Sequence, residues 1–451
     1  MSPAVVYLLS HVLLVPLGAA AAFHPSVRDL PVAARCGLAF GSGAVFLTIE
    51  GLLTSLAGLP WSVASLAAPL LALSAVSVLV AGRRRAPAVP PLPHSGWRPA
   101  TILAGAAVLL ALVHLSLSLA TARATSVDFL FFWGVKAARF AEAKMIHTEL
   151  LAWPYFAHAV PDYPPLVPVT EAFSVLAAGE MPWRRAPIAS MFWLAAALPL
   201  VYGLLRRRLD KDAAAGVTAF WGAALSTSLV HSYSGGNAEA PLLFFETVAG
   251  AALLAEEERE RAPSRFLPAL AMAGAVLTKV EAVPALLFLV AGTLLRDRLE
   301  RRPAVFREAL PLIVFPALAL GSWFAFQWLS GLRVGYRGHG PFFAITFAHL
   351  GSIAKEFPRQ LNAGTFGLSW ILPLAFLATS RQFRAALPGL ALAVGLLGFL
   401  AFDYLHDVTD PAVRIGWTLP RVSQPALSLT ILGAGIVFFS GQSRRPDGRV
   451  V

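Results

Sequence analysis

The sequence has few charged side chains and almost no cysteine, and each shortage excludes a class of protein. Only 14% of its 451 residues are charged, whereas a soluble protein carries about a quarter. Such a chain offers too little polar surface for a soluble fold or a basic nucleic-acid interface. Cys36 is the one cysteine, which excludes an intramolecular disulfide framework. A hydrophobic share of 57% excludes disorder and leaves a polytopic membrane protein.

Apolar runs recur along almost the whole chain, each near the roughly 20 residues that a helix needs to cross a bilayer. They predict an all-α, polytopic transmembrane bundle of about thirteen spans. One long run is interrupted by Thr278-Lys279-Val280-Glu281, which predicts the tight turn of a helical hairpin. The expected spans start near residues 3, 34, 61, 100, 188, 213, 240, 265, 282, 309, 366, 387 and 424.

The basic residues predict the orientation of these spans. Lys and Arg number 36 against 25 Asp and Glu, a net charge of +11. Short arginine clusters, such as Arg83-Arg84-Arg85 and Arg206-Arg207-Arg208, follow alternate spans. Such clusters mark cytoplasmic ends, so we interpret the excess charge as a topology signal. The opposite, outer side then carries longer segments, where binding residues are expected. They are residues 122–187, 231–239, 331–365 and 403–423.

The first outer segment is the most informative stretch of the sequence. Asp128 precedes an aromatic stripe at helical spacing, which predicts a helix lying on the outer membrane surface. Asp128 either caps that helix or acts as a general base at the edge of a cavity. Asp162 and Tyr163 lie in a proline-rich stretch that is either a rigid turn or a face toward a polar substrate. The stripe consists of Phe129, Phe132, Trp133, Ala137 and Phe140.

The later outer segments supply cations that could bind a phosphate. Lys279 either pairs with Glu281 to close the hairpin or attracts a phosphate at the membrane edge. Arg414 and Arg421 either anchor the chain at the interface or bind a phosphate in bidentate fashion. His339 lies in a glycine-rich loop that could cover a bound substrate. A last cluster forms either a divalent-cation site or a solvated loop, and consists of Asp403, His406, Asp407 and Asp410.

Several of these motifs, in this order, resemble bacterial members of the GT-C glycosyltransferase superfamily. The chain is similar to dolichyl-phosphate-mannose–protein mannosyltransferases and to lipid A aminoarabinose transferases. The resemblance covers about residues 100–425, after a three-span extension at 1–99 and before a last span and basic tail at 426–451. The matching stretches are Asp128 to Ala137 with Trp133 and Lys136, Pro161 to Leu166, Gly236 to Glu239, Leu277 to Glu281, and the segment ending in Arg421.

The resemblance implies an inverting glycosyltransferase on the outer face of a bacterial inner membrane. It implies a polyprenyl-phosphate sugar as donor and a hydroxyl of a glycan, lipid or protein as acceptor, with no nucleic acid as partner. Asp128 would be the general base and Asp162 a second acid. No cofactor is certain, and a divalent cation is possible. Lys279, Arg414 and Arg421 would bind the phosphate; Trp133, Lys136, Tyr163, Glu239, Glu281 and His339 would contact substrate.

Two other classes of function fit the composition. A transporter or flippase for lipid-linked glycans would use the charges near Lys279 as a translocation path, but it predicts repeat symmetry, and no convincing repeat is evident. A non-catalytic subunit of a membrane assembly would need none of these charges to meet.

Overall fold

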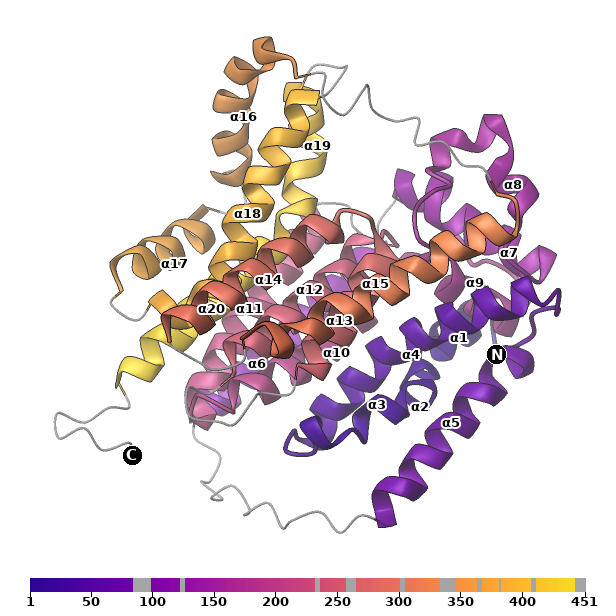
Figure 1. The fold of residues 1–451 in the computed structure, drawn as a ribbon, viewed down its shortest axis with the longest axis horizontal. Coiled ribbons are helices and arrows are strands. Elements are labelled where there is room, and N and C mark those ends of the chain that lie inside the picture. Colours follow the sequence, from indigo (N-terminus) through magenta and orange to yellow (C-terminus); the bar gives the residue numbers. More distant parts are fainter. Residues whose placement is uncertain are drawn as a thin grey trace.

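The computed structural model describes ten stretches of the chain, and every regular element in them is a helix (Figure 1). Six helical segments are long and apolar enough to cross a membrane, or seven if the bent pair Pro411–Val422 and Gln424–Phe439 counts as one span. The described residues are 1–83, 99–121, 126–231, 236–256, 265–300, 305–332, 345–362, 367–380, 383–406 and 411–442. The six segments are Val32–Leu56, Val63–Ala81, Ile102–Thr121, Ala186–Leu205, Ala309–Leu329 and Phe383–His406.

The first half of the chain alternates long helices with short turns. Its helices are α1 (Pro3–Val12), α2 (Leu14–Leu17), α3 (Ala19–Ala22), α4 (Val32–Leu56), α5 (Val63–Arg83), α6 (Pro99–Thr121), α7 (Gly134–Ala143), α8 (Thr148–Ala152), α9 (Leu166–Ala178), α10 (Ser190–Leu205) and α11 (Lys211–His231). The shorter turns are η1 (Pro25–Val27), η2 (Phe129–Trp133), η3 (Pro154–Ala159) and η4 (Ala186–Ala189).

The second half is helical in the same way. It contains α12 (Glu239–Leu254), α13 (Phe266–Thr278), α14 (Ala282–Leu299), α15 (Val305–Leu329), α16 (Leu350–Asn362), α17 (Gly367–Thr379), α18 (Leu387–Asp403), α19 (Pro411–Val422) and α20 (Gln424–Gln442). The turns η5 (Phe347–His349), η6 (Phe383–Ala386) and η7 (Tyr404–His406) join them. A helix begins near each of the thirteen expected span positions, but only six of the described helical segments, or seven with the bent pair, are long and apolar enough to cross a bilayer, so thirteen spans are not confirmed.

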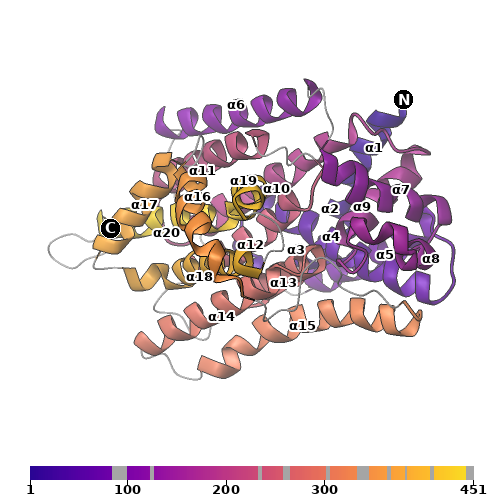
Figure 2. The same ribbon diagram turned by 90° about the horizontal axis from the view of Figure 1, so that it is seen from above.

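Helix α12 lies at the centre of the molecule, and the helices around it carry the apolar surface. All residues of α12 are buried, against α10, α13 and α20 among others. Figure 2 shows α12 inside the body, with α6 and α15 on opposite edges. Helix α6 exposes Leu103 and Leu110 at 70% and 68%. Apolar surface of this extent is unusual in a soluble monomer, which indicates a membrane protein.

The N-terminal helices share the core with the rest of the chain. Helix α4 packs against α10 and α13, and α1 packs against α9. The Tyr7 hydroxyl of α1 donates a hydrogen bond to Glu171 of α9, and the amide of Trp61 donates to the carbonyl of Lys144 at 2.6 Å. The division of the chain at residue 99 therefore stays a prediction, since the extension does not stand apart in space.

The expected surface helix after Asp128 is wrong in one respect, because its aromatic stripe faces protein. Phe129, Trp133 and Phe140 are at most 3% exposed, and α7 packs on α9. Residues 129–133 form a π-helical turn, which widens the helix by one residue per turn. Lys136, expected off the stripe, is buried as well, because it lies three residues after Trp133 and four before Phe140 on one face of the helix.

The close packing of α4 on α10 gives a testable prediction. A Cβ added at Gly37 of α4 would lie 2.2 Å from the carbonyl oxygen of Ala196 in α10. Gly37→Ala should therefore lower the melting temperature of the purified protein, whereas Gly216→Ala, where a Cβ meets open space, should hold or raise it, because alanine favours helix by about 0.5–1 kcal/mol. Equal melting temperatures for the two variants would contradict this packing.

Candidate functional site

A cavity of about 670 Å³ lies where the ends of several helices meet. Its size is within the range of sites that hold a small ligand. Charged and aromatic side chains line one part, and apolar side chains of α14 and α18 line the rest. The polar and aromatic lining residues are Asp128, Trp133, Tyr163, Lys279, Glu281, Asp403, Tyr404, His406, Arg414, Thr418 and Arg421; the apolar ones include Phe132, Val280, Pro284, Phe399, Leu400 and Phe402.

Asp128 and Arg421 form an ion pair in the cavity wall. Asp128 has helical backbone angles and makes no side-chain capping bond, so its interpretation as a simple helix cap is wrong. Its carboxylate instead accepts a hydrogen bond from Nη1 of Arg421, in the last turn of α19. The two side chains are 23% and 19% exposed. Both therefore stay accessible from the cavity while neutralising each other.

The backbone before α12 helps to place Asp128. Gly236 has a φ of 80°, and a Cβ there would lie 2.5 Å from the ring of Phe129, the residue after Asp128. Only glycine accepts this conformation without strain. The Ser126 hydroxyl lies 2.6 Å from Oδ1 of Asn237. These contacts hold the start of the η2 turn against the start of α12, which brings Asp128 close to the Glu239 end of that helix.

Lys279 and Glu239 form a second pair, deeper in the structure. Glu239 is the first residue of α12, and Lys279 follows the last residue of α13 in extended backbone. Lys279 Nζ lies 3.0 Å from Oε1 of Glu239, and the two side chains are 9% and 2% exposed. The alternative in which Lys279 closes the hairpin by pairing with Glu281 is therefore wrong, although the break in the apolar run does lie between α13 and α14.

Tyr163 connects the two sides of the cavity. Its hydroxyl donates a hydrogen bond of 2.6 Å to Oε1 of Glu281. Its ring stacks on Trp133 with centroids 5.8 Å apart and planes at 25°, and the ammonium of Lys279 lies 5.9 Å from its centroid. Tyr163 and Trp133 thus form a rigid aromatic wall of the cavity beside the charged groups. The interpretation of the proline-rich stretch as a rigid turn alone does not account for this position of Tyr163.

Arg414 lies on the same face of α19 as Arg421 but two turns away. Its Nη2 lies 2.9 Å from Oδ2 of Asp403, and its guanidinium lies 5.7 Å from the ring centroid of Tyr404. Seven residues of helix separate the two arginines by about 10 Å. Arg414 therefore belongs to a different part of the cavity from Arg421 and Lys279.

The predicted substrate contact Lys136 and the predicted second acid Asp162 both lie behind the cavity wall. The Lys136 ammonium donates a 2.7 Å hydrogen bond to the carbonyl of Val160, which has a φ of 47°. The carbonyl of Asp162 accepts a 2.9 Å hydrogen bond from Nε1 of Trp323. Neither Lys136 nor Asp162 lines the cavity, and both hold the turn that leads to Tyr163. His339 lies outside the described residues.

The end of the cavity near α18 and α19 contains polar residues that were not predicted as site residues. Asp403 and His406 line it, although a solvated loop was the alternative for their cluster, and Tyr404 and Thr418 line it too. A signal was present, because Arg414, Thr418 and Arg421 are spaced four and three residues apart, on one helix face. Among the described residues no group of three or more His, Cys, Asp or Glu could hold a metal ion; Asp407 and Asp410 lie outside them.

Comparison with protein-family models, with curated proteins and with solved structures finds no match for this chain. The site must therefore be interpreted from its own chemistry. Nε of Arg421 and one oxygen each of Glu239 and Glu281 are buried without a hydrogen-bond partner among the described residues. Buried polar groups of this kind are costly unless a ligand or water meets them. The site can accept an anion by exchanging a carboxylate for it at Arg421.

Burial lowers the pKa of Lys136 to about 7, against the opposing effect of the Asp162 carboxylate. In the unfolded chain its pKa is about 10.4. Between these values unfolding takes up a proton, so raising the pH stabilises the folded state. Going from about pH 7 to pH 10, the melting temperature of the wild type should therefore rise relative to that of Lys136→Met. A difference that stays constant over this range would contradict the buried position of Lys136.

Proposed function

We propose that the protein is a membrane glycosyltransferase that moves a sugar from a polyprenyl-phosphate donor to an acceptor hydroxyl. The observation that carries the proposal is that Asp128, Arg421 and Lys279 line one cavity, although they lie in three distant parts of the sequence. A carboxylate beside two cations provides a base for the acceptor and a counter-charge for a phosphate leaving group. This arrangement also agrees with the order of motifs that resembles the GT-C superfamily.

The donor has a natural place in the cavity. Its phosphate would replace Asp128 at Arg421 and use the buried, unpartnered Nε of that side chain, since arginine binds phosphate in bidentate fashion. Lys279 would contribute a second positive charge. The prenyl chain would leave along the apolar part, past Pro284, Phe399 and Leu400. The sugar would lie against the stacked rings of Trp133 and Tyr163, which offer apolar faces of the right kind.

The phosphate exchange also prepares the base. In the ligand-free site the carboxylate of Asp128 is paired with Arg421 and accepts a hydrogen bond from it. Once the phosphate occupies Arg421, Asp128 is free to take the proton of the acceptor hydroxyl. The acceptor oxygen then forms a bond to the anomeric carbon, and the bond from that carbon to the phosphate oxygen breaks. The electron pair leaves with the phosphate, where Arg421 and Lys279 stabilise the added negative charge. Attack opposite the leaving group implies inversion.

The location of the reaction follows from the distribution of arginine. Arg265, Arg296 and Arg298 lie at the ends of α13 and α14 that are remote from Lys279 and Glu281. Basic ends of membrane helices face the cytoplasm, so the cavity would open on the outer face of a bacterial inner membrane. This topology includes the shorter apolar helices among about thirteen spans. The acceptor would be a glycan, lipid or protein available on that side.

Replacing the proposed base tests the reaction directly. Asp128→Asn should lower sugar transfer by about 10²–10⁴-fold, the usual contribution of a general base, in membranes supplied with labelled polyprenyl-phosphate sugars. Asp29→Asn is the matched control, because Asp29 also pairs with an arginine, Arg207, but lies elsewhere. Normal transfer by Asp128→Asn, at normal expression, would rule out this mechanism.

Replacing Arg421 tests the phosphate site. Polyprenyl phosphate should raise the melting temperature of the wild type, because a ligand that binds only the folded state stabilises it. The shift should be small or absent in Arg421→Gln and intact in Arg359→Gln, since the side chain of Arg359 is 66% exposed, pairs with Glu356 within α16 and does not line the cavity. Equal shifts in all three proteins would show that the lipid phosphate does not bind at Arg421.

A further inference from the structure

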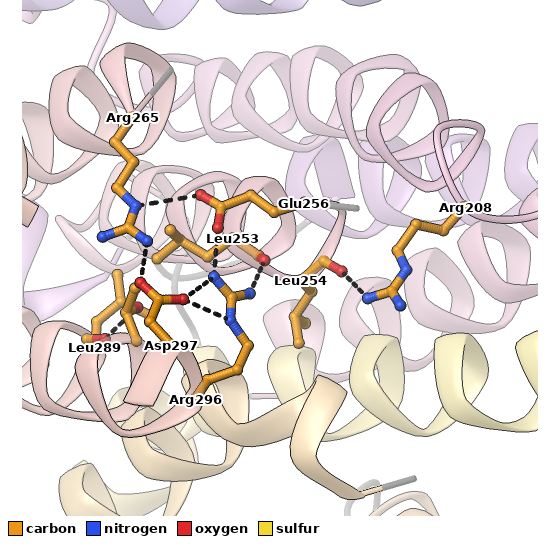
Figure 3. A network of polar contacts seen from close by, with 9 residues as sticks. Arg208, Leu253, Leu254, Glu256, Arg265, Leu289, Arg296 and Asp297 are labelled. Carbon is orange, nitrogen blue, oxygen red and sulfur yellow. Dashed lines mark hydrogen bonds and ion pairs between the residues drawn. The ribbon is translucent and has the colours of Figure 1, made fainter. Parts of the chain in front are cut away.

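A second group of buried charges lies at the far end of the helices that carry the site. Figure 3 shows Arg265 and Arg296 facing Glu256 and Asp297 in one network. Arg265 pairs with Asp297, Arg296 pairs with Glu256, and Arg265 Nε lies 3.5 Å from Oε1 of Glu256. Arg296 Nη2 lies 3.3 Å from Oδ1 of Asp297. None of the four side chains is more than 8% exposed, so water contributes little to their solvation.

The network also holds the end of α12. Nη1 of Arg296 donates a 2.6 Å hydrogen bond to the carbonyl of Leu253, and Nη1 of Arg208 donates one of 3.1 Å to the carbonyl of Leu254. The last carbonyls of a helix lack partners within the helix and carry partial negative charge. Two arginines, Arg296 of α14 and Arg208 in the turn after α10, therefore hold the end of α12 in place.

Three helices run between this network and the cavity, and each has a charged group at both ends. They are α12, α13 and α14, which are antiparallel neighbours in the chain and pack together. Their lengths imply about 20–25 Å between the two groups of charges. The end groups are Glu239 and Glu256 for α12, Lys279 and Arg265 for α13, and Glu281 and Asp297 with Arg296 for α14.

Apart from the ring of Phe245 of α12, which lies against Gly274 of α13, the surfaces between the two ends give few specific contacts to set how far one helix slides along another. The buried residues of α13 are almost all Ala, Leu, Val, Met and Gly, and such contacts lack direction. A shift of one turn moves a side chain by about 5.4 Å, which would separate Lys279 from Glu239. Buried ion pairs add little net stability, but they are well suited to fix register.

We propose that Arg265, Arg296, Glu256 and Asp297 are positioning residues that set the axial register of α12, α13 and α14, and so bring Glu239, Lys279 and Glu281 together in the cavity. The register itself does not depend on the reaction; only the effect on transfer rests on the proposed function. A network that acted locally would affect the helix ends where it lies and leave the cavity end unchanged.

Hydrogen–deuterium exchange of the full-length protein separates these two roles. In Asp297→Asn, amide exchange at residues 278–284 should rise by about tenfold or more, because loss of one partner of a buried pair is strongly unfavourable. Asp29→Asn, which alters an exposed pair, should leave these residues unchanged. If exchange rises only near residues 253–256 and 296–300, the network is a local clamp and the proposal is wrong.

A variant in which apolar side chains replace all four charged residues separates an effect on helix register from a loss of stability. Arg265→Met, Arg296→Met, Glu256→Leu and Asp297→Leu together should leave the melting temperature at or above that of the wild type, since apolar residues often replace buried pairs at no cost. Exchange at residues 278–284 should nevertheless rise, and sugar transfer should fall. A stable variant with a wild-type cavity end would overturn the proposal. If the wild type transfers no sugar, the proposed function fails, while exchange still decides the register.

Discussion

The constraint on which the structure depends is that charge buried in an apolar helical body must be matched by opposite charge. The central helices α12 and α13 are buried along almost their whole length and α14 on one face, and all three have charged groups only at or near their ends, apart from Glu246 within α12. At one end Lys279 meets Glu239, and at the other arginines meet Glu256 and Asp297. These pairings fix where each helix begins and ends relative to its neighbours. The cavity lies at the Lys279 end of these helices, where the neighbouring pair of Asp128 and Arg421 remains partly exposed.

In the ligand-free cavity three cations are each paired with a carboxylate. Arg421 is held by Asp128, Lys279 by Glu239 and Arg414 by Asp403. An anion that binds at Nη1 of Arg421 must displace the carboxylate of Asp128, which makes weak, unspecific binding there unfavourable. In the proposed reaction this requirement becomes useful, because the phosphate that displaces Asp128 also frees the group that must accept a proton. Binding of the phosphate and release of Asp128 as the base then occur together at Arg421.

The all-helical architecture and several residues of the cavity were predictable from the sequence, whereas the contacts between these residues were not. Apolar runs marked where helices begin, and isolated charges at their ends marked Asp128, Lys279 and Arg421, because both signals are local. Partners were not predictable, since Glu239 reaches Lys279 across 40 residues of sequence and Asp128 reaches Arg421 across 293. The burial of Lys136 was within reach of helical periodicity, because the residue lies three positions after Trp133 and four before Phe140, both of which are buried. The number of membrane spans, in contrast, cannot be predicted from local sequence, because short apolar helices such as α13 lie inside the bundle.

The most direct test of the central claim is a structure of the protein with a polyprenyl phosphate bound. The account predicts that the phosphate lies within hydrogen-bonding distance of Arg421 and close to Lys279, and that the carboxylate of Asp128 has left Arg421 and faces the cavity. A phosphate bound elsewhere, or one bound while Asp128 and Arg421 remain paired, would contradict it.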